Sequence, residues 1–177
     1  TPLTKYRRHV LMLHPHTVIV YDELEASEAV RWEWLLHSPT EFKMDVTKKT
    51  LSTNNKTQGW VAVTQLFGGH VFTLSQTDRF VVPPAITGAE YPNQWHLTAR
   101  VDGCSATRFL AIIQVGDEAV PIINRDGDTF NVGDWTIKAV LDASKVPELA
   151  VSHRTEQAVF SYGTDNPALN GNFYSRQ

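Results

Sequence analysis

The segment AVRWEWLLHS, residues 29–38, decides the fold class because its apolar and polar side chains alternate. Arg31, Glu33 and His37 share one parity, and Leu35 is the exception to the pattern. The apolar positions of the other parity are Val30, Trp32, Trp34 and Leu36. Alternation of this kind is typical of a β-strand that buries one face and exposes the other.

Two tryptophans on one strand face can form either a platform for a sugar ring or part of a core. The charges on the opposite face favour the core, because each indole ring buries on the order of 200 Å². We therefore expect Trp32 and Trp34 to be mostly buried, packed between two sheets. We expect His37, on the other face, to point toward a neighbouring layer.

The same β pattern recurs along the chain on both sides of this segment. No window carries a helical period over ten residues, and Asp126-Gly127 is a hairpin signal because it tolerates the positive φ of such a turn. Strand-like segments lie at 8–13, 17–24, 29–38, 42–47, 50–53, 60–67, 70–76, 96–101, 107–115, 120–125, 128–132, 135–142, 149–153 and 158–163. About a dozen short strands predict an all-β chain folded as an antiparallel two-layer β-sandwich.

The length of 177 residues fits one domain with a core of its own. We expect a β-sandwich module over residues 1–165 and a loop-like C-terminal tail over residues 166–177. The segment 81–94 holds three prolines and little periodicity, so it is predicted to be a long loop.

Composition excludes several classes of function. The net charge of −3 does not provide the general basic field of a nucleic-acid-binding protein. No apolar run approaches the roughly 20 residues that span a membrane, so no membrane association is expected. The one cysteine, Cys104, is interpreted as a small buried hydrophobe.

Residue types that carry catalysis are present but scattered. His14 and His16 flank Pro15, which favours an exposed turn over a zinc site needing three or four ligands. Asp126 and Asp128 fit hairpin chemistry better than a calcium loop. No nucleophile elbow or phosphate-binding glycine loop occurs. We therefore predict no catalytic residues, no metal site and no cofactor in this chain.

Two places could meet a ligand. Trp95 and Tyr91 lie in or beside the proline-rich segment, where long loops tend to carry function. Lys5, Arg7 and Arg8 form a basic cluster that could meet acidic sugars or keep a strand edge charged against unwanted pairing.

The first 40 residues resemble the β-sheet region of the heparinase II/III-like polysaccharide lyases. The shared run is a basic Arg-His pair, an apolar strand, a proline turn, a second apolar strand that ends in Asp, and a Trp-rich strand that ends in Leu-His. Its elements here are Arg8-His9, Val10 to Leu13, Pro15, Val18 to Asp22, and Trp34 to His37. The segments TRFLAIIQV and WTIKAVLD also look like that region's closing strands.

The resemblance implies a C-terminal β-sandwich module that supports an α/α-toroid domain of the same parent chain. His37 is then expected to face either a neighbouring layer or that toroid. Such lyases cleave uronic-acid-containing polysaccharides by β-elimination and usually act in the periplasm or after secretion. The toroid is not matched here, and the His-rich catalytic loop is expected to lie before Thr1, so the chain alone is expected to be inactive. The residues expected to contact the acidic polysaccharide are Arg7, Arg8, His37, Tyr91 and Trp95.

Two alternatives stay open. One is a free-standing carbohydrate-binding or interaction module with Trp95 and Tyr91 as its platform. The other is a β-barrel metalloenzyme that uses His14 and His16.

Overall fold

The computed structural model describes residues 2–47, 50–55, 59–79, 93–116 and 120–163, and within these ranges every regular element is a β-strand. The strands are β1 (Leu3–Leu13), β2 (Thr17–Ser38), β3 (Lys43–Asp45), β4 (Thr50–Asn55), β5 (Trp60–Gly68), β6 (Thr73–Thr77), β7 (Trp95–Gly116), β8 (Ile123–Asp126), β9 (Thr129–Val132), β10 (Trp135–Ala139), β11 (Leu149–His153) and β12 (Glu156–Tyr162). No helix of this part of the chain is long and apolar enough to cross a membrane.

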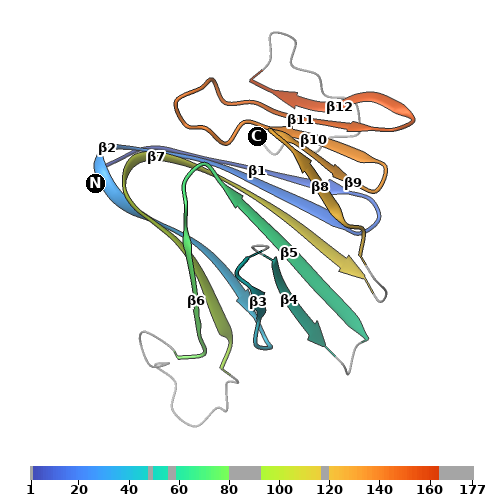
Figure 1. Ribbon diagram of the computed structural model, residues 1–177, viewed down its shortest axis with the longest axis horizontal. Coiled ribbons are helices and arrows are strands. Elements are labelled where there is room, and N and C mark those ends of the chain that lie inside the picture. The colour runs from blue at the N-terminus through green and yellow to red at the C-terminus, as the bar shows by residue number, and fades with distance from the viewer. Residues whose placement is uncertain (1, 48–49, 56–58, 80–92, 117–119, 164–177) are drawn as a thin grey trace, which may run out of the picture.

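The strands form two sheets in which every pair is antiparallel (Figure 1). The first sheet runs β1-β2-β7-β5-β4-β3, and β6 also pairs with β7. The second sheet runs β12-β11-β10-β9-β8 and lies over one end of the first. This arrangement confirms the predicted antiparallel two-layer β fold. The predicted tail at 166–177 lies outside the described residues, as does most of the predicted loop.

The two central strands, β2 and β7, are much longer than the sequence predicted. Each is 22 residues long and joins two segments that were expected to be separate strands. Register shifts between Glu25 and Trp32 mark β-bulges, which bend a strand without ending it. On β7, Gly103 has a φ of 71°, a conformation that suits glycine. The bulges carry the first sheet around a bend, so that it curls on itself.

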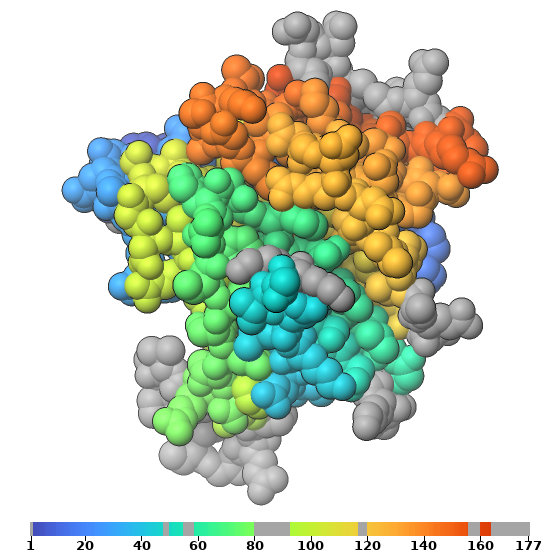
Figure 2. Space-filling model, in the orientation of Figure 1, coloured from blue at the N-terminus to red at the C-terminus, as the bar shows by residue number. Residues whose placement is uncertain are grey.

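The molecule has two hydrophobic cores. The first lies between the sheets, where Ile19, Tyr21 and Leu110 of the first sheet meet Phe130 and Ile137 of the second. The second core lies entirely within the curl of the first sheet. Its buried members are Trp32, Trp34, Phe42, Leu51, Leu66, Phe72, Leu97, Ala99, Val101, Phe109 and Ala111. In Figure 2 the segments coloured cyan to green, which include β3 to β6 of the first sheet, lie below the orange second sheet.

The tryptophan prediction was confirmed in burial but wrong in its partner. Trp32 and Trp34 are 8% and 5% exposed. They pack against β4, β5 and β7 of their own sheet instead of the second sheet. Parity defines the buried face of a strand, but the bend in β2 decides what that face meets.

Candidate functional site

The basic cluster lies on β1, an edge strand of the first sheet. Successive side chains on a strand point to opposite faces, so Arg7 and Arg8 cannot share one site. The Arg7 guanidinium faces the second sheet, where it contacts the Tyr162 hydroxyl and lies 5.3 Å from the centroid of that ring. Arg8 lies on the other face, 5.7 Å from the centroid of the Tyr6 ring.

Two of the three cations are paired with carboxylates. Lys5 Nζ lies 2.9 Å from Glu23 Oε2 and 3.1 Å from Glu25 Oε1, and the hydrogen bond to Glu23 chiefly raises the pKa of Lys5. Arg8 donates two hydrogen bonds to Asp22, at 2.6 and 2.8 Å. The charges of Lys5 and Arg8 are therefore already balanced, which leaves these two side chains less available to an acidic sugar. Among the described residues, Arg7 is the cation of this cluster that contacts a phenol instead of a carboxylate.

Beside Arg7, His9 completes a group of unlike polar side chains. Its ring lies 4.3 Å from the Tyr162 ring, centroid to centroid, and His9 Nε2 is 3.8 Å from Glu23 Oε1. Burial chiefly lowers the pKa of His9, because loss of solvent disfavours the charged imidazole. We name Arg7, His9 and Tyr162 the edge cluster. It brings a guanidinium, an imidazole and a phenol together where β1 meets β12.

The sequence analysis identified Arg7 but missed Tyr162. β12 lies next to β1 only because the second sheet packs on the first, and no local pattern in the sequence predicts that contact. Asp22 is the residue that ends the second apolar strand in the family resemblance. It is buried and accepts two hydrogen bonds from Arg8.

The predicted contacts His37 and Trp95 lie at the far end of β2 and β7. The exposed His37 stacks on His96, with ring centroids 4.4 Å apart. Trp95 pairs with Ser38 in the register and packs, half-buried, against the tryptophan core. His37 and Trp95 therefore occupy opposite faces of the sheet. Tyr91 lies outside the described residues.

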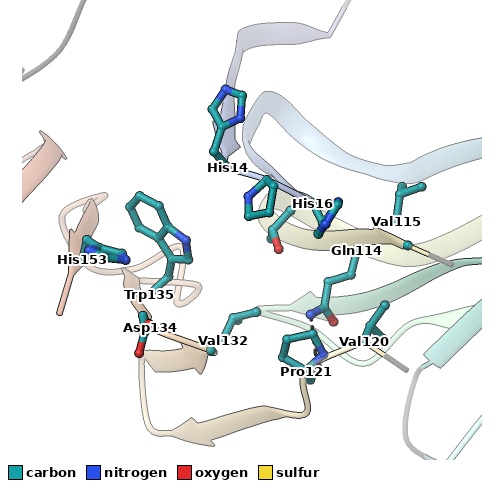
Figure 3. Close-up of a pocket in the computed structure, with 14 residues that line it drawn as sticks. His14, His16, Gln114, Val115, Val120, Pro121, Val132, Asp134, Trp135 and His153 are labelled. Atoms are coloured by element: carbon teal, nitrogen blue, oxygen red, sulfur yellow. Dashed lines mark hydrogen bonds between the residues drawn. The ribbon is translucent and has the colours of Figure 1, made fainter. Parts of the chain in front are cut away.

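A pocket that the sequence did not predict lies at the turn between β1 and β2 (Figure 3). His14 and His16 are exposed on this turn, as predicted. They face Trp135 and His153 of the second sheet across a volume of about 400 Å³. We name this feature the turn pocket.

No group of three or more histidine, cysteine, aspartate or glutamate side chains that could hold a metal ion occurs in the part of the chain that the structure describes. Cys104 is half-buried beside the tryptophan core, and burial chiefly raises the pKa of its thiol. A raised thiol pKa disfavours the reactive thiolate.

Comparison with solved structures identifies proteins that share this fold. Two solved structures of a heparinase III gene product are similar to it, one of them with methylated lysines. The methylated structure matches with a TM-score of 0.63 and 15% identity, over 93% of this chain and 24% of that chain. The other matches with a TM-score of 0.59 and 15% identity, over 90% of this chain and 24% of that chain.

This chain therefore has the fold of a heparinase III region and spans about a quarter of the length of the structures it matches. No family model matches the sequence. No curated protein matches it either.

Proposed function

We propose that this chain is the β-sheet module of a polysaccharide lyase related to heparinase III. In this proposal it supports an α/α-toroid catalytic domain of the same parent chain. The observation that carries the proposal is the match of nearly the whole chain to about a quarter of heparinase III. Action in the periplasm or after secretion belongs to the same proposal.

We assign the substrate contact to the edge cluster. β-Elimination next to a uronate needs a base at the C5 proton, an acid at the leaving oxygen and a cation or donor for the carboxylate. Arg7 is exposed and could supply the cation. Lys5 and Arg8 already serve Glu23 and Asp22.

The other described tyrosines are poorly placed to act with Arg7. Tyr6 lies on the opposite face of β1. Tyr21 is fully buried and donates a hydrogen bond to the Val140 carbonyl at 2.8 Å. Burial also raises the pKa of Tyr21, which keeps its phenol protonated. We expect the isolated chain to lack the complete catalytic set because, in this proposal, the toroid domain carries the principal catalytic residues.

The alternative of a carbohydrate-binding module based on Trp95 and Tyr91 has less support. Trp95 packs against the tryptophan core, and Tyr91, the other half of that platform, lies outside the described residues.

The proposal is tested with the isolated chain and with the full product of its parent gene. Each is offered heparin, heparan sulfate, hyaluronan and alginate, and the ultraviolet absorbance of the unsaturated product is followed. We expect sustained product formation from the full product and none from the isolated chain. Sustained cleavage by the isolated chain would show a self-sufficient enzyme, and no cleavage by either protein would remove the lyase assignment.

Arg7→Ala tests the substrate contact in the same proteins. We expect the variant to bind several-fold more weakly to whichever polysaccharide the full product cleaves. The difference in affinity should shrink as salt rises, because added ions screen exposed charges. Arg31→Ala removes an equal charge from an exposed position on β2, where Arg31 pairs with Asp102. Equal losses in the two variants would show that only overall charge matters.

A further inference from the structure

The turn pocket is built from both sheets and is fixed by their backbones. Val115 N donates to the His16 carbonyl at 2.9 Å, which ties the turn to the end of β7. Arg154 N donates to the Asp134 carbonyl at 2.9 Å and ties the β9–β10 turn to the end of β11. These two hydrogen bonds therefore fix the backbone on both sides of the pocket.

Trp135 gives the turn pocket an aromatic wall. It starts β10, which lies between β9 and β11, and its ring packs at the margin of the core between the sheets. The His153 ring meets it edge-on, with centroids 4.6 Å apart. Figure 3 shows the indole between His153 on one side and Gln114 and His16 on the other. The half-buried ring is thus held in one orientation inside a hollow.

The polar side chains of the turn pocket are the Gln114 amide and the imidazoles of His14, His16 and His153, together with the Thr17 hydroxyl and the Asp134 carboxylate. Gln114 is only 2% exposed, and its Nε2 donates to the Pro121 carbonyl at 3.1 Å, which orients the amide. His153 Nδ1 lies 2.8 Å from Thr155 Oγ1, which fixes that ring as well. An amide offers both donors and acceptors, and a neutral imidazole offers one of each. Such groups suit the neighbouring hydroxyls of a sugar.

The lining holds no lysine or arginine among the described residues. Phosphate and sulfate groups are usually recognised by such cations. The missing cations argue against a strongly anionic ligand, and the aromatic wall favours a ring with an apolar C–H face. The volume of about 400 Å³ lies within the range of about 300–1,000 Å³ that is usual for small-molecule sites.

We propose that the turn pocket binds an uncharged pyranose ring of an oligosaccharide, stacked on Trp135 and hydrogen-bonded by Gln114 and His16. This site is separate from the edge cluster. A strand advances about 3.3 Å per residue, which places His14 on the order of 20 Å from Arg7 along β1. The pocket goes beyond the lyase proposal and does not depend on it.

The test is a titration of the purified chain with a cello-oligosaccharide, a chito-oligosaccharide and, as the anionic probe, a heparin oligosaccharide. Binding is followed by nuclear magnetic resonance through the indole N–H of Trp135 and the backbone amides of the turn. We expect saturable shifts with at least one neutral probe, and little change of that affinity with salt. No saturable shift with either neutral probe would overturn the proposal, as would a preference for the heparin oligosaccharide that falls steeply with salt.

Variants locate the site. We expect Trp135→Ala to weaken neutral-probe binding at least tenfold and His16→Ala about threefold. His16 is exposed on a turn, so its variant keeps the test decisive even if Trp135→Ala unfolds. Tyr6→Ala removes an exposed aromatic from the other face of β1 and should leave the affinity unchanged. Equal binding by wild type and His16→Ala, or a loss in Tyr6→Ala as large as in His16→Ala, would contradict the proposed site.

Discussion

At the scale of single residues, the tryptophans of this chain have different roles. Trp32 and Trp34 are buried in the curl of the first sheet, whereas Trp95 lies half-buried at the margin of the same core. Trp135 forms the wall of a pocket. One residue type therefore supplies both core and candidate binding surface, and its neighbours in space decide which.

Truncation of Trp34 tests the core role. We expect Trp34→Ala to lower the free energy of unfolding by roughly 3–5 kcal/mol, because the cavity it leaves adds to the lost burial. Urea denaturation of the two proteins measures the difference. Unchanged stability together with lost sugar binding would instead assign Trp34 to a sugar platform.

Trp34→Phe is the matched control. Trp34 Nε1 is buried without a hydrogen-bond partner among the described residues, and such a group costs about 1–3 kcal/mol. Phenylalanine keeps an aromatic ring and removes the unpaired N–H, so its loss of stability should be well below that of Trp34→Ala. Equal losses would show that the indole fits this site in a way that no smaller ring replaces.

His9 makes stability depend on pH. Burial lowers the pKa of His9 below its ordinary value of 6.5, with Arg7 adding to the effect and Glu23 opposing it. As the pH falls through 6.5, His9 is protonated in the unfolded chain but stays neutral in the folded protein. The free energy of unfolding therefore falls as the pH drops below 6.5.

We expect His9→Phe to show a smaller loss of unfolding free energy than wild type as the pH falls through this window. Phenylalanine fits among the aromatic rings that surround His9, and it does not titrate. Denaturation curves on both sides of pH 6.5 provide the measurement. Parallel pH profiles for the two proteins would show that His9 titrates normally in the folded state.

At the scale of elements, β7 connects the two halves of the molecule. One part of it pairs with β5 and another with β6, and Arg108 lies near the junction. Arg108 is 4% exposed and donates to the carbonyls of Val140, Asp142 and Lys145, at 3.1, 2.8 and 2.6 Å. One buried guanidinium therefore fastens the first sheet to the connection between β10 and β11.

Loss of the three hydrogen bonds of Arg108 should lower the stability of the protein. We expect Arg108→Met to lower the free energy of unfolding by on the order of 3 kcal/mol or more, since each hydrogen bond from a charged group contributes about 1.5–3 kcal/mol. Arg100→Met is the control, because Arg100 is partly exposed on the same strand and pairs with Asp102. Exposed pairs contribute about 0–1 kcal/mol. Similar losses in both variants would contradict the fastening role.

At the scale of the whole molecule, three candidate surfaces are kept apart. The edge cluster lies where β1 meets β12, the turn pocket lies at the β1–β2 turn, and the His37–His96 pair lies at the far end of β2. The long strands set these separations, because they extend the first sheet well past the second.

The sequence by itself determined the fold class, the burial of the Trp32 and Trp34 face, and the hairpin at Asp126-Gly127, where Gly127 has a φ of 56°. These properties follow from side-chain period and turn chemistry, which act over a few residues. Only the tertiary structure decided that 17–24 and 29–38 form one strand, because the bulges of β2 are stabilised by its pairing with β7. It also decided that Arg7 meets Tyr162 and that His16 faces Trp135, because contacts between distant segments depend on how two sheets pack, and no local pattern encodes that packing.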